Sequence, residues 1–97
     1  MMENVKRYSS FIKRIVTAPT PIRVKLLKTS NFKIITAISE IVYNIIHKNI
    51  KVTAPTLTKL RKYKKVLYKL IAARPSSIKE ILLRNPNCLI PLSVLFK

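Results

Sequence analysis

A chain of 97 residues is long enough for one small domain, and its hydrophobic fraction of 48% is too high for an ordinary disordered basic tail. Its 20 Lys and Arg residues are opposed only by Glu3, Glu40 and Glu80, so the formal net charge is +17. Such self-repulsion indicates an anionic partner, which could be nucleic acid, an acidic membrane surface or an acidic protein. Glycine is absent, which argues against glycine-rich phosphate loops and a Rossmann-type site.

The N-terminal residues predict one amphipathic helix over 4–17. Its apolar residues recur at helical spacings and are Val5, Tyr8, Phe11, Ile12, Ile15 and Val16. We expect Pro19 and Pro21 to end this helix and to favour an extended link, because proline removes a helical hydrogen bond. Residues 22–28 fit either one or two helical turns or a short strand, since apolar residues alternate there.

The clearest pattern lies in residues 31–48. The apolar positions repeat every three or four residues and are Ile34, Ile35, Ile38, Ile41, Val42, Ile45 and Ile46. A strand would alternate strictly, so the spacing predicts the central helix of a small core. Ser30 or Asn31 can cap its start, and Asn49–Val52 is expected to be a link.

Residues 54–73 predict a second long helix, with Thr53 as its N-cap and Pro55 in its first turn. At 100° per residue its apolar face consists of Leu60, Tyr63, Leu67, Leu70 and Ile71. The opposite face gathers Arg61, Lys62, Lys65 and Lys69, and Lys64 falls near the apolar side, from which it would have to extend outward to water. We expect this helix to pack on helix 31–48 as an antiparallel hairpin.

The C-terminal part predicts a short helix and an apolar tail. Ser77 and Glu80 have the spacing of a capping box, which would open a helix that runs to about Arg84. The tail cannot form one regular helix across Pro91, and it either packs on the helices or is held for a protein partner. The expected organisation is therefore an N-terminal helix and link (1–21), a helical core (22–85) and an apolar tail (86–97). The expected fold is all-α, with three to four short helices.

Residues suited to catalysis or metal binding are few. His47 stands beside a lysine at a helix end, which is typical of a surface residue, and Cys88 is the only cysteine. A metal site needs three or four ligands, and the sequence does not group them. We therefore expect no enzymatic activity, no metal and no cofactor. The N-terminus lacks the continuous apolar centre of a secretory signal, and no run of about 20 apolar residues predicts a transmembrane helix.

Binding to an anion is the function that the charge pattern favours. Residues 53–74 carry seven Lys and Arg residues and no acid. The candidate nucleic-acid-binding residues are Lys59, Arg61, Lys62, Lys64, Lys65 and Lys69. Their cations can neutralise a phosphate backbone, and Tyr63 and Tyr68 can hydrogen-bond phosphate or stack on an exposed base. The alternatives are a solvated lysine face, a membrane-active amphipathic protein, and a structural cement protein in a capsid-like or ribosome-like assembly.

The stretch from Ile38 to Leu92 resembles the small, very basic proteins of Polinton/Maverick-type elements and adintovirus-like viruses. The matching features are the link Asn49-Ile50, the helix start at Thr53 and Pro55, the basic stretch 60–64 and the tail 89–92. A double glycine usual before the tail is replaced by residues 85–88, so a stiffer hinge is expected here. The resemblance implies a protein of the virion or host nucleus that condenses a viral genome or is a minor virion component. The expected activity is sequence-nonspecific binding of double-stranded DNA.

Overall fold

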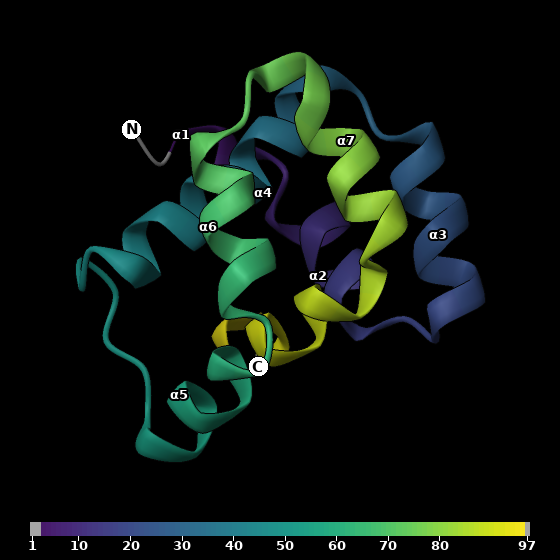
Figure 1. Ribbon diagram of the computed structural model, residues 1–97. Helices are drawn as coiled ribbons and strands as arrows, with labels where there is room; N and C mark the ends of the chain where they lie inside the picture. The colour runs from purple at the N-terminus through teal and green to yellow at the C-terminus, as the bar shows by residue number, and fades with distance from the viewer. Residues whose placement is uncertain (1–2, 97) are drawn as a thin grey trace.

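The computed structural model describes residues 3–96 and is all-helical over that range. The elements are α1 (Glu3–Arg7), α2 (Ser9–Thr17), α3 (Thr20–Thr29), α4 (Phe32–Ile46), α5 (Ala54–Arg61), α6 (Lys64–Ala72), α7 (Pro75–Arg84) and the 3₁₀-helix η1 (Pro86–Phe96) (Figure 1). The expectation of three to four helices is therefore wrong, although the all-α class is confirmed. The extra helices arise because two expected long helices are each divided and the tail is itself helical.

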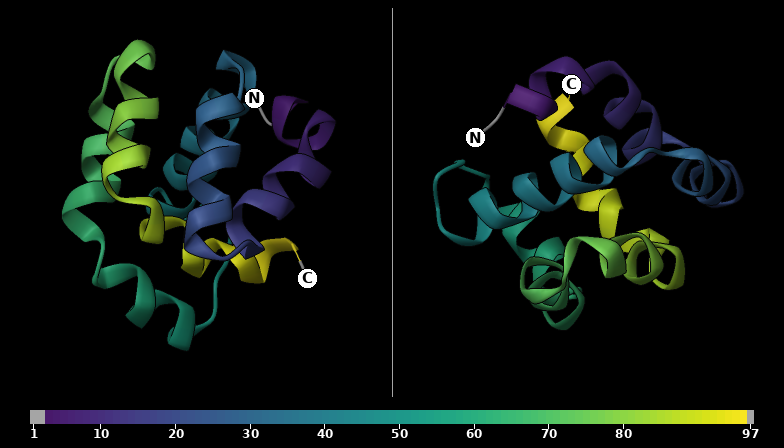
Figure 2. Two further views of the ribbon diagram at one scale, coloured as in Figure 1. Left: turned by 90° about the vertical axis from the view of Figure 1, so that its right-hand side faces the viewer. Right: turned by 90° about the horizontal axis from the view of Figure 1, so that it is seen from above.

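Helix α4 runs through the middle of the molecule. Seen from above, it lies between α1 and α2 on one side and α6 and α7 on the other (Figure 2). Six of its seven predicted stripe residues are buried, and Ile46 packs against the core from its edge. The side chain of Asn31 accepts a hydrogen bond from the backbone N–H of Ile34 at 2.9 Å, so Asn31 is the N-cap that starts this helix.

The expected helix over 4–17 is divided at Tyr8, whose φ of −107° and ψ of 17° leave the helical region. The division lets α1 pack on α4 while α2 packs on α3 and η1. The proline link is also shorter than expected, because only Ala18 and Pro19 are non-helical. Pro21 lies in the first turn of α3, where its missing N–H has no intrahelical partner to lose, so residues 22–28 are helical rather than extended.

The end of α4 is closed by a Schellman turn that uses a lysine where glycine is usual. Lys48 has φ of 61°, the left-handed region. The N–H of Asn49 donates to the carbonyl of Asn44 at 2.8 Å, and the N–H of Lys48 donates to that of Ile45 at 3.1 Å. The Asn49 side-chain amide also donates to Asn44 Oδ1 at 2.9 Å. These bonds hold the left-handed residue in a chain that contains no glycine.

The predicted helix over 54–73 is also two helices. Two hydrogen bonds between residues three apart close α5. The backbone N–H of Lys62 donates to the carbonyl of Lys59 at 3.3 Å, and that of Tyr63 donates to the carbonyl of Leu60 at 3.0 Å. Helix α5 then packs on η1, whereas α6 packs on α4 and α7. Neither Gly nor Pro causes the break. Both Leu60 and Leu67 are buried in the core, and the turn at residues 62–63 lets each reach it from a separate helix.

The capping-box prediction is wrong. Helix α7 begins at Pro75, three residues before the start that a Ser77 cap predicts, and Glu80 does not reach back to Ser77 but pairs with Arg84 at 2.7 Å. Proline at the first position starts the helix instead. Lys79 takes a different role, because its Nζ donates to the carbonyls of Lys28 and Ser30 at 2.6 and 3.0 Å and so satisfies the end of α3.

The apolar tail packs on the helices as η1, which crosses one end of the helical layers (Figure 2). Cys88, Leu89, Pro91 and Leu92 are buried. One hydrophobic cluster therefore draws residues from all three expected segments, 1–21, 22–85 and 86–97.

A buried cation joins the tail to the N-terminal half. Arg23, on α3, is only 3% exposed. Its Nε donates to the carbonyl of Ile15 at 2.9 Å, and its Nη2 donates to those of Ala18 at 2.6 Å and Val16 at 3.3 Å. These carbonyls end α2, where positive charge is favoured. Asn87 Oδ1 accepts from Thr20 Oγ1 at 2.9 Å, and Arg23 Nη1 lies 3.5 Å from the same oxygen. Burial lowers the pKa of Arg23, while Cys88 and Tyr63 act in the opposite direction.

Candidate nucleic-acid interface

All six predicted binding cations are exposed on the surface of the protein. Lys59 and Arg61 belong to α5, Lys62 lies at the junction, and the other three residues, Lys64, Lys65 and Lys69, belong to α6. The expectation that Arg61, Lys62, Lys65 and Lys69 line one continuous helix is wrong, because the chain turns at residues 62–63.

Helix α6 presents the most regular part of this surface. Lys64, Lys65, Tyr68 and Lys69 follow one another within an arc of about 140° at 100° per residue, and all four are exposed. The opposite side of the helix carries the buried residues Leu67 and Leu70. Lys64 begins this helix on its exposed side, so it does not have to extend past apolar neighbours as expected. We call Lys64, Lys65, Tyr68 and Lys69 the α6 face.

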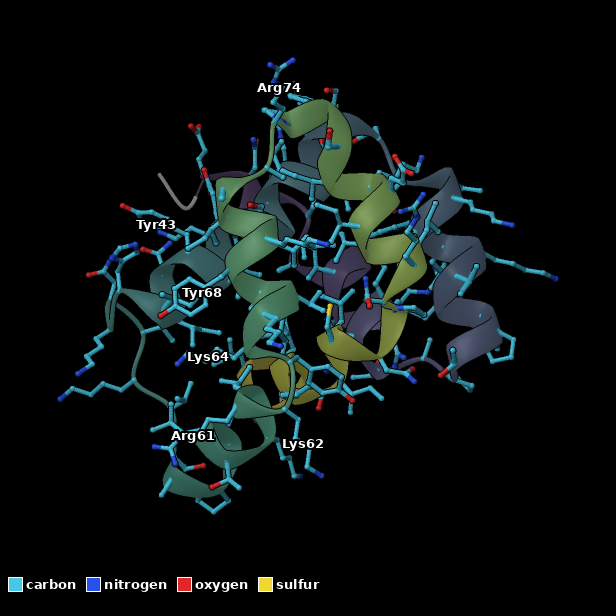
Figure 3. All side chains as sticks on the ribbon, in the orientation of Figure 1. Tyr43, Arg61, Lys62, Lys64, Tyr68 and Arg74 are labelled. Carbon is cyan, nitrogen blue, oxygen red and sulfur yellow. The ribbon has the colours of Figure 1, made fainter. Side chains whose placement is uncertain are left out.

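Helix α5 adds cations at one end of the α6 face. Figure 3 shows Arg61, Lys64 and Tyr68 projecting to the same side, while Lys62 projects away from them. Arg61 and Tyr68 also line one shared cavity. Arg74 is exposed at the other end of α6, at the top of the view. Cations therefore flank the α6 face at both ends.

The two predicted tyrosines are placed differently. Tyr68 is 49% exposed, so its ring is available to a ligand, whereas Tyr63 is half-buried against the core. A base could therefore stack on Tyr68, and Tyr63 has a packing role.

Sequence reasoning missed two residues close to this surface. Tyr43, on α4, is 40% exposed, and its ring centroid lies 4.2 Å from that of His47. The sequence did carry a signal for the exposure of Tyr43, because this residue falls outside the apolar stripe of α4. Lys48 lines the same cavity as Arg61 and Tyr68. No sequence signal placed Lys48 there, because its position depends on the Schellman turn after α4.

The charged side chains of α5 and α6 are all positive. Helices α5 and α6 contain no acidic residue. Within residues 3–96, the one ion pair is that between Glu80 and Arg84, which lies on α7. The cations of α5 and α6 therefore have no carboxylate partner in the described part of the chain and are free to pair with an external anion.

Other kinds of site find little support in the described residues. No cluster of three or more His, Cys, Asp or Glu side chains there could hold a metal ion. No helix within 3–96 has the length and apolar character needed to cross a membrane. A scan against protein-family models and searches of curated proteins and solved structures find no match to this chain.

Proposed function

We propose that this protein binds double-stranded DNA through its phosphate backbone, without sequence preference. The observation that carries the proposal is the α6 face, where three exposed lysines and Tyr68 stand together without an acidic neighbour on the same helix. Each phosphate that a cation neutralises releases condensed counterions, and this release favours binding at any sequence.

The dimensions of α6 suit this role. Nine residues at 1.5 Å each give a helix of about 14 Å. That length corresponds to about four steps along duplex DNA at 3.4 Å each. The α6 face and the flanking residues Arg61 and Arg74 can therefore supply about four to six phosphate contacts. Base-specific readout finds no support. Helices α5 and α6 have no Asn or Gln that could bond adenine, and Arg61 is their one arginine.

Membrane activity is the second candidate. The amphipathic segments 4–17 and 54–73 bury their main apolar side chains in the shared core, which leaves lysines rather than an apolar face outside. A surface-seeking helix needs an apolar face to enter the lipid boundary. The packing therefore favours DNA over a membrane, although anionic lipid also attracts the cations.

The setting that we propose rests on the resemblance to Polinton/Maverick-type and adintovirus-like proteins. It is a virion or a host nucleus, in which the protein condenses a genome or is a minor virion component. We propose no catalytic activity. Cys88 is fully buried, and burial raises the pKa of its thiol to about 12, so a reactive thiolate is disfavoured.

The test compares two triple variants with the same loss of charge. Lys64, Lys65 and Lys69 are changed to Gln in the first, and the exposed lysines Lys13, Lys25 and Lys33 of other helices are changed to Gln in the second. Binding to a random duplex is measured across a salt series. Loss of three phosphate contacts should make the log–log salt slope about 2.7 shallower in the first variant. Equal losses in both variants would show that net charge alone governs binding, and the α6 face would have no special role.

A further inference from the structure

An apolar cavity of about 190 Å³ lies between the end of α4, helix α5 and helix α6. Its walls are aliphatic and come from Val42, Ile45, Ile46, Leu60, Leu67 and Leu92. Leu92 comes from η1, so four elements surround the cavity, and α5 and α6 form separate walls because the chain turns at residues 62–63. The cavity is therefore a product of the helix break.

The mouth of this cavity combines exposed apolar groups with positive charge. Leu57 is 42% exposed and Tyr68 is 49% exposed, and both line the cavity. Lys48 and Arg61 line it too, and no acidic side chain is among the described residues that do so. Figure 3 shows Lys64 on the same side as Arg61 and Tyr68. An occupant would thus meet an apolar interior and a cationic rim.

We propose that this cavity binds a large apolar side chain carried by an acidic segment of another protein. The volume exceeds the roughly 150 Å³ of an apolar cavity that accepts benzene, so a Leu or Phe side chain fits. Acidic residues beside that anchor would pair with Lys48 and Arg61. The inference concerns a protein partner and does not depend on DNA binding at the α6 face.

Other occupants fit the cavity less well. A nucleobase carries polar edges, and below the rim of Lys48, Arg61 and Tyr68 the aliphatic walls offer those edges no side-chain hydrogen-bond partner. A second copy of this chain would bring a further net charge of +17 towards the same rim, and repulsion opposes that approach. An acidic partner has the opposite charge, and its attraction to the rim would hold the apolar anchor at the cavity. An amphipathic helix is one form that presents such anchors at i and i+4.

The experiment uses the full chain and two synthetic peptides of equal negative charge. One is a helical peptide of Glu, Ala and Gln with two Leu at i and i+4, and its match has Ser in place of both Leu. Fluorescence anisotropy should give at least tenfold tighter binding of the Leu peptide to the unchanged protein. Leu57→Ser should weaken the Leu peptide about fivefold and leave the Ser peptide unchanged. Ile22→Ser is the matched control, because Ile22 is an exposed apolar residue (50%) on α3.

Three results would overturn the proposal. Equal affinity of the two peptides would mean that charge alone attracts them. An equal effect of Leu57→Ser and Ile22→Ser would place the apolar contact elsewhere. If Leu57→Ser weakened a single-stranded oligonucleotide and spared both peptides, the cavity would belong to nucleic acid. A Leu-dependent affinity that Leu57→Ser alone reduces would support the cavity as a protein-docking site.

Discussion

Removal of the buried Arg23 guanidinium should be among the most destabilising single changes in this protein. Arg23→Met preserves much of the side-chain volume and leaves the carbonyls of Ile15, Val16 and Ala18 without their donor. It also removes one of the two contacts between α3 and Asn87 of η1, and the bond from Thr20 remains. The buried carbonyls of Ile15 and Val16 at the end of α2 would then lose the donor that the guanidinium supplies.

The two shortest bonds, at 2.6 and 2.9 Å, set the magnitude. A hydrogen bond from a charged donor contributes about 1.5–3 kcal/mol. The Met variant no longer bears the desolvation cost of a buried guanidinium, and this offsets part of the loss. We therefore expect the free energy of unfolding to fall by about 3 kcal/mol. For a domain of this size, that corresponds to a Tm lower by about 12–24 °C.

Thermal unfolding followed by circular dichroism tests this expectation. Arg14→Met, at an exposed site on α2, is the matched control and should leave Tm nearly unchanged. Arg23→Lys should fall between the two, because a single ammonium group cannot reach all the carbonyls. If Arg23→Met melted within about 2 °C of the unchanged protein, the guanidinium would not hold the end of α2, and this reasoning would fail.

Two other single changes test the backbone and the core. Lys48→Gly should raise the free energy of unfolding by about 1 kcal/mol in chemical denaturation, because glycine adopts φ of 61° without strain. The control Lys51→Gly, in the same loop, should give no gain. Equal effects of the two substitutions would refute backbone strain at Lys48. Burial raises the pKa of the Cys88 thiol from 9.0 to about 12, and nearby Arg23 offsets part of that rise. The stabilising contribution of the neutral thiol is therefore complete below about pH 9 and is lost as pH rises towards 12. Relative to Cys88→Ala, the unchanged protein should lose about 1.4 kcal/mol per pH unit above pH 9, and a constant difference between pH 8 and 10.5 would contradict this.

The sequence predicted the central helix well because its pattern is local. Isoleucines at spacings of three and four permit one buried face. The cap is also local, because the side chain of Asn31 accepts from the backbone N–H of Ile34, only three residues later. Exposure of the six candidate cations was also predictable, since unpaired lysine is rarely buried.

The sequence did not predict features that depend on tertiary packing. The turns at Tyr8 and Tyr63 contain neither Gly nor Pro, and they exist because the flanking helices pack on different neighbours. Burial of Arg23 was missed because its partners are the carbonyls of an earlier helix, which carry no sequence signal. The capping box failed because Pro75 starts α7 before Ser77 is reached. The arrangement of the candidate site follows from the turn at Tyr63, so its residues were predicted and its geometry was not.

The most direct test of the central claim is paired binding of the unchanged protein to a random DNA duplex and to anionic liposomes, each across a salt series. Four to six phosphate contacts predict a log–log salt slope of roughly −4 to −5 for DNA. We expect that slope, together with weak liposome binding that is restricted to low salt. A shallow DNA slope combined with strong liposome binding and leakage would contradict the account and identify the protein as membrane-active.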